Sequence, residues 1–107
     1  MHVRMARFEG VDVSRLEEDY AQYRKMLRSN ERPEFIPEEV FETLRDRVRR
    51  VLSLADREAG VTVDFTFTDS AEDAQRVHEA LDSLTPPEGS GRRTSVETFE
   101  LVLDEQL

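Results

Sequence analysis

Asp64 is the residue in this sequence with the clearest capacity for chemistry. It lies within residues 61–68, where threonine or aspartate occupies every second position and Thr66 follows two residues later. A carboxylate held in the middle of a sheet can act as a base if burial raises its pKa. The alternative is an exposed aspartate, or one in an ion pair with Arg4. We therefore treat Arg4, Asp64 and Thr66 as ligand-binding candidates.

His78 is the fourth candidate, because imidazole serves as a general base or as a haem or metal ligand. The competing interpretation is a histidine that packs along the edge of its helix. The chain has no cysteine, and no acidic residue or second histidine stands at metal-ligand spacing from His78 or His2. We predict no metal and no cofactor, and the sequence assigns no catalytic residue.

Composition narrows the range of partners. A chain of 107 residues fits a single domain, 1–107, and its formal net charge of -9 repels nucleic acid. No run of about 18 apolar residues is available for a membrane span. The absence of cysteine and of a leader-like N-terminus favours a cytoplasmic location. Lys25 is the only lysine among many arginines, which is typical of a GC-rich bacterial genome.

The elements that must position these residues follow from periodicity and capping. Residues 3–8 alternate as a strand. A helix begins at Ser14, where Glu17 completes a capping box, and ends near residues 29–30. A short helix of about two turns follows Pro37. A third helix is capped by Asp69 and Ser70 and stopped by residues 86–87, and a loop at 88–93 leads to the last strand at 95–103.

Residues 47–54 are ambiguous, because their apolar positions also fit a continued helix. The segment 56–60, which ends in Gly60, has the composition of a tight turn, and the clearest strand in the chain begins directly after it. A hairpin needs a strand on both sides of its turn, so we predict a strand at 48–55. The order β-α-β-β-α-β then predicts a ferredoxin-like α+β fold. Its antiparallel sheet has the helices on one face, and the extra short helix precedes the second strand.

Alternation divides the strand at 61–68 between two faces. We predict that its valines and phenylalanines lie under the helices, whereas Thr62, Asp64, Thr66 and Thr68 point away from them. In a dimer formed through the open sheet face, these polar residues would line a cavity. The first strand adds either His2, Arg4 and Ala6 to that face or Val3 and Met5, depending on its register.

Three segments resemble antibiotic-biosynthesis-monooxygenase-like domains: LSLADREAG at 52–60, DSAEDA at 69–74 and TSVETFELV at 94–102. The resemblance covers the chain well from residue 52 onward and the first strand and helix loosely. It implies a homodimer in which two sheets pack face to face as a dimeric α/β barrel. Activities in that family include cofactor-independent oxidation of aromatic molecules and haem degradation.

Two functions remain open at this point. The first is a homodimeric domain that is non-catalytic or binds a small hydrophobic molecule. The alternative is a cofactor-independent monooxygenase-type enzyme that acts on a hydrophobic aromatic substrate. Binding of a small molecule or oxygenase activity predicts a pocket that can take a hydrophobic ligand, whereas a non-catalytic domain predicts a cavity filled by its own side chains.

Overall fold

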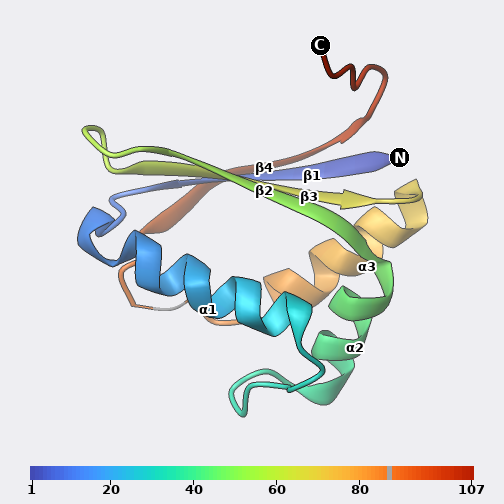
Figure 1. Ribbon diagram of the computed structural model, residues 1–107, viewed down its shortest axis with the longest axis horizontal. Helices are drawn as coiled ribbons and strands as arrows, with labels where there is room; N and C mark the ends of the chain where they lie inside the picture. The colour runs from blue at the N-terminus through green and yellow to red at the C-terminus, as the bar shows by residue number, and fades with distance from the viewer. Residues whose placement is uncertain (87) are drawn as a thin grey trace.

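Four strands form one antiparallel sheet in the order β2-β3-β1-β4, and the helices all lie on one side of it (Figure 1). The computed structural model describes residues 1–86 and 88–107. The strands are β1 (His2–Glu9), β2 (Val48–Asp56), β3 (Val61–Thr68) and β4 (Arg92–Glu100). The helices are the 3₁₀ turn η1 (Val13–Arg15), α1 (Leu16–Arg28), α2 (Glu38–Arg47) and α3 (Ala71–Asp82). This arrangement fits the predicted ferredoxin-like α+β class.

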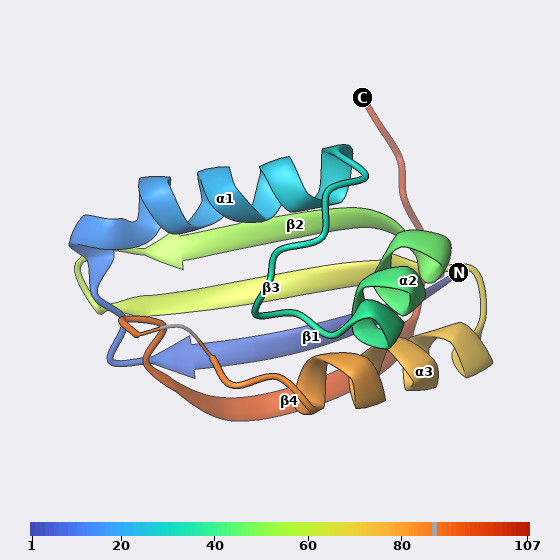
Figure 2. The same cartoon turned by 90° about the horizontal axis from the view of Figure 1, so that it is seen from below.

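The helices cover different parts of the sheet. Figure 2 shows α1 along the β2 edge, α3 along the opposite side near β1 and β4, and α2 across one end. The connector from α1 to α2 passes between α1 and α3, and its Ile36 is buried. Among the residues that the structure describes, no helix combines the length and the apolar character needed to cross a bilayer.

The strand predicted at residues 48–55 is confirmed. α2 ends at Arg47, and β2 begins at once and pairs with β3 from Val48↔Thr68 to Asp56↔Val61. Helical periodicity alone cannot show that this segment is a strand, because the strand is stabilised by hydrogen bonds to β3. Gly60 has φ +68°, the left-handed conformation that the tight turn requires.

Several predicted boundaries are wrong. Asp12 caps the first helical segment, because its Oδ1 accepts from the Ser14 backbone N–H at 3.1 Å and from Ser14 Oγ at 2.6 Å. The predicted capping box is absent from the described residues, since Glu17 binds Arg57. α2 has 10 residues where two turns were expected. α3 ends at Asp82, before the predicted proline stop, and Pro87 lies outside the described residues.

The last strand is also shifted toward the N-terminus. β4 spans Arg92–Glu100. The sequence predicted a strand at 95–103 and placed Arg92 and Arg93 in the preceding loop. Arg92 pairs with Glu9 and Arg93 with Phe8, beyond a register shift at which Thr94 of β4 has no partner in β1. At the other end, Glu100 pairs with His2, and one further backbone hydrogen bond joins the Leu101 N–H to the Met1 carbonyl at 2.8 Å.

The main hydrophobic cluster lies between the helices and not at the centre of the sheet. Its buried members come from α1, the connector, α2 and α3, and they are Met26, Ile36, Phe41, Leu44 and Val77. Val77 is fully buried.

Candidate functional site

The two faces of the sheet are the reverse of the prediction. Thr62, Thr66 and Thr68 have exposed fractions of 4%, 4% and 0%, and Asp64 accepts a hydrogen bond from Tyr20 of α1. The polar face therefore lies under the helices. Alternation shows that two sets of residues lie on opposite faces, but it does not show which face the helices cover. Here Tyr20 of α1 and His78 of α3 provide hydrogen-bond partners for the polar set.

The register of β1 brings more polar groups to the same face. Arg4 is opposite Thr66 and Ala6 is opposite Asp64, so His2, Arg4 and Ala6 share the helix-covered face. This is the first of the two registers that the sequence left open. Arg4 is only 5% exposed. A charged side chain is thus held between the sheet and the helices.

Tyr20 and Asp64 form the first polar pair. The Tyr20 hydroxyl donates to Asp64 Oδ1 at 2.9 Å. Burial raises the pKa of Asp64, while hydrogen bonds from Ser53 and Tyr20 and the charge of Arg4 oppose that rise. Burial, together with the nearby Asp64, raises the pKa of Tyr20 to about 12. Tyr20 is therefore the proton donor of the pair at neutral pH, and Asp64 is the acceptor.

Arg4 and His78 form the second pair. Arg4 Nε donates to His78 Nδ1 at 3.1 Å, so this geometry assigns the imidazole proton to Nε2. Burial lowers the pKa of Arg4, yet a guanidinium remains charged at any pH at which the protein folds. Tyr23 lies in the same layer, and burial raises its pKa to about 12. Nδ1 of His78 is occupied by Arg4 and is not available to a haem or a metal.

The four candidate residues from the sequence thus lie on one face but in different pairs. The ion pair between Arg4 and Asp64, one of the alternatives that the sequence left open, does not form: within the described ranges, no contact of 4.0 Å or less joins them. Thr66 is buried opposite Arg4 on β1 and opposite Val51 on β2. Sequence reasoning missed Tyr20 and Ser53 as partners of Asp64. The only indication in the sequence was the position of Tyr20 on the predicted buried stripe of its helix.

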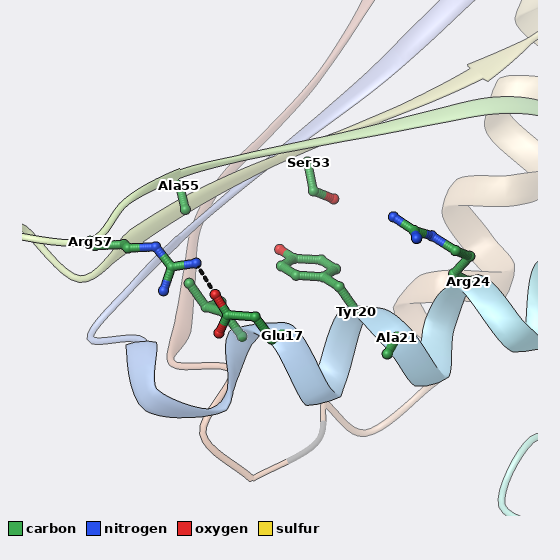
Figure 3. Close-up of a pocket in the computed structure, with 8 residues that line it drawn as sticks. Glu17, Tyr20, Ala21, Arg24, Ser53, Ala55 and Arg57 are labelled. Atoms are coloured by element: carbon green, nitrogen blue, oxygen red, sulfur yellow. Dashed lines mark hydrogen bonds and ion pairs between the residues drawn. The ribbon is translucent and has the colours of Figure 1, made fainter.

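An open groove of about 390 Å³ lies between α1 and the edge strand β2. Tyr20 and Ser53 face each other across it (Figure 3). Asp64 lies directly behind, paired with Ser53 across β2 and β3 and bonded to Tyr20. The remaining lining residues are Leu16, Glu17, Ala21, Arg24, Ala55 and Arg57. A ligand in the groove can therefore reach the hydroxyls of Tyr20 and Ser53, which bind the partly buried Asp64 carboxylate.

The opposite, open face of the sheet carries several large apolar side chains. Leu54 is 55% exposed, Phe99 is 51% exposed and Leu52 is also exposed. Arg50 covers one end of this face, with its guanidinium carbon 5.2 Å from the centre of the Phe67 ring. The C-terminal segment after β4 rises on the same side (Figure 1), and its Asp104 lies 3.6 Å from Arg50. The polar set of β3 does not lie on this face, where it was predicted to line a cavity.

No protein-family model matches the chain, and the comparison with curated proteins finds no match either. The function is therefore inferred from the geometry of the groove and of the two sheet faces.

Proposed function

We propose that this protein is a small-molecule-binding domain without catalytic activity, and that its ligand enters the groove between α1 and β2. One observation carries this proposal: a hydrogen-bonded Tyr20–Asp64 pair lies at a groove of about 390 Å³. Ligand pockets of this size class combine apolar walls with a few fixed polar groups. Here Leu16, Ala21 and Ala55 supply the apolar walls.

The polar end of the groove defines what the ligand must offer. Tyr20 already gives its proton to Asp64, so its oxygen is left as an acceptor toward the groove. Ser53 also donates to Asp64, so its oxygen too is left as an acceptor. A small and largely apolar molecule with one hydroxyl group meets these requirements.

Fragment binding followed by amide NMR tests the proposal. Phenols and short aliphatic alcohols should shift the amide signals of Tyr20, Ala21 and Ser53. Ser53→Leu fills the groove and should abolish those shifts, while Ser95→Leu, in the strand at the other edge of the sheet, should preserve them. Circular dichroism confirms that both variants fold. Shifts that persist in Ser53→Leu, or that never occur at these amides, would reject the groove as the binding site.

A second candidate function is a cofactor-independent monooxygenase-type enzyme that acts on a hydrophobic aromatic substrate. Burial raises the pKa of Asp64, which makes its carboxylate a stronger base toward a phenolic hydroxyl. Oxygen consumption measured with an electrode distinguishes the two candidates. Uptake that depends on a bound phenol and disappears in Asp64→Asn would favour the enzyme, and no uptake would favour the binding domain.

We also propose that two copies pair through their open sheet faces, in the manner of a dimeric α/β barrel within a bacterial cytoplasm. Support comes from the exposed Leu52, Leu54 and Phe99 on one continuous face, since large apolar patches mark interaction surfaces. Light scattering should give about twice the chain mass of 12.4 kDa. Leu54→Asp should produce monomers, whereas Phe35→Asp, at an exposed site in the connector, should not. A wild-type monomer would refute the pairing.

A further inference from the structure

Charge is distributed unevenly along the groove between α1 and β2. At one end Arg57 is bound to Glu17, so the two charges neutralise each other (Figure 3). At the other end the guanidinium of Arg24 extends toward Tyr20 and Ser53 (Figure 3). Within residues 1–86 and 88–107, no carboxylate oxygen lies within 4.0 Å of its nitrogens. Arg24 is thus the free cation of the groove.

We infer that the ligand of this groove is an organic anion whose carboxylate binds Arg24 and whose hydroxyl binds at the Tyr20–Ser53 end. This inference rests on the proposed function of the groove and deepens it. A guanidinium recognises a carboxylate through two parallel N–H donors, and this geometry favours carboxylates over neutral amides. The chain as a whole carries a net charge of -9, so the attraction of an anion depends on this local cation.

The orientation of the ligand follows from the charges that face the groove. Asp64 lies behind Tyr20, and Glu17 lies at the Arg57 end. Asp64 repels an anion beside Tyr20, and the Glu17–Arg57 pair offers an anion no net positive charge. The carboxylate of the ligand is therefore directed to Arg24, and its neutral hydroxyl to Tyr20 and Ser53.

The spacing along α1 sets the length of the ligand. Glu17, Tyr20 and Arg24 lie on one stripe of the helix, because residues three and four apart are neighbours on its surface. Tyr20 and Arg24 are one turn apart, about 6 Å along the axis. One aromatic ring with substituents at opposite ends spans that distance, and it can stack beside the Tyr20 ring.

A matched pair of probes tests this inference. We would titrate 4-hydroxybenzoate and 4-hydroxybenzamide, which differ in charge but have the same ring and hydroxyl, and follow the amide signals of Tyr20, Ala21 and Ser53. Wild-type protein should bind the acid about fivefold more tightly than the amide, as expected for a solvent-exposed ion pair. Arg24→Gln should remove this preference. Arg28→Gln, one turn further along α1 and outside the groove, should keep it.

The outcomes separate the inference from the function on which it rests. If the acid and the amide bind the groove of the wild-type protein equally well, the anionic ligand is refuted and the small-molecule site stands. The same holds if the preference survives in Arg24→Gln. If neither probe shifts the groove amides, and the broader set of phenols and alcohols does not either, the proposed function fails and the inference fails with it.

Discussion

Replacing Tyr20 with phenylalanine removes one hydroxyl and keeps the ring that lines the groove. Asp64 then loses the donor that lies 2.9 Å from its Oδ1. A hydrogen bond to a charged group contributes about 1.5–3 kcal/mol to stability. Tyr20 is only half-buried, so we expect a loss in the lower part of that range, about 1.5–2 kcal/mol at pH 7. For a domain of this size, that loss lowers Tm by roughly 6–16 °C.

The loss in Tyr20→Phe should depend on pH in a defined direction. Burial raises the folded pKa of Asp64 above its ordinary value of 3.8. Asp64 therefore favours the folded state most below that value, and this contribution is lost as the pH rises through the raised pKa. Tyr20 is one of the groups that lower this pKa, because it stabilises the carboxylate. Its removal should be costly at pH 7 and cost less at pH 3, where the carboxyl group is neutral.

Urea unfolding at pH 7 and at pH 3 measures both effects. Tyr23→Phe is the matched control, because no hydrogen bond is formed by the Tyr23 hydroxyl within the described part of the chain. We expect that variant to stay within about 0.5 kcal/mol of the wild type. The reasoning is refuted if Tyr20→Phe is equally destabilising at the two pH values, or if it is no more destabilising than Tyr23→Phe.

Two further predictions concern Arg4 and the glycines beside β1. Arg4→Met removes a positive charge that lowers the pKa of Asp64, so that pKa should rise in a carbon-13 titration of the carboxyl group. Arg7→Met, on the other face of β1, should leave the pKa of Asp64 unchanged. A lower pKa of Asp64 in Arg4→Met would contradict the electrostatic account. Gly10→Ala and Gly91→Ala both place alanine at positive φ, which costs about 1–2 kcal/mol. A Cβ at Gly91 would also lie 2.2 Å from the Glu9 carbonyl oxygen, whereas one at Gly10 meets nothing within 4 Å. Urea unfolding should therefore show a larger loss for Gly91→Ala, and equal losses would exclude the steric clash.

Local patterns in the sequence were sufficient to predict the order of strands and helices. The turn that ends in Gly60 predicted a hairpin, and Asp69-Ser70 predicted the start of α3, where Ser70 Oγ accepts from the Asp73 backbone N–H. These signals depend on neighbours in the chain, so they can be read without a structure. The ends of β4 could not be predicted, because they depend on where β1 offers a partner.

The candidate site was predicted only in part. Alternation in β3 grouped Asp64 with Thr66, and the first of the two registers considered for β1 added Arg4. Asp64 was expected to point away from the helices, but it bonds to Tyr20, which is 44 residues away in sequence. An ion pair of Asp64 with Arg4 was one of the alternatives for Asp64, but Arg4 bonds to His78. These pairings depend on how α1 and α3 cross the sheet, and no local pattern records that geometry.

The sequence by itself determined that residues 61–68 carry one polar and one apolar set of side chains, because a strand turns successive residues to opposite sides. Only the tertiary structure decided which set the helices cover. The polar set lies under the helices, where Tyr20 of α1 bonds to Asp64 and His78 of α3 bonds to Arg4. Packing among the helices supplies a separate apolar core. With the polar set under the helices, the groove lies beside Tyr20, and Leu52, Leu54 and Phe99 lie on the open face.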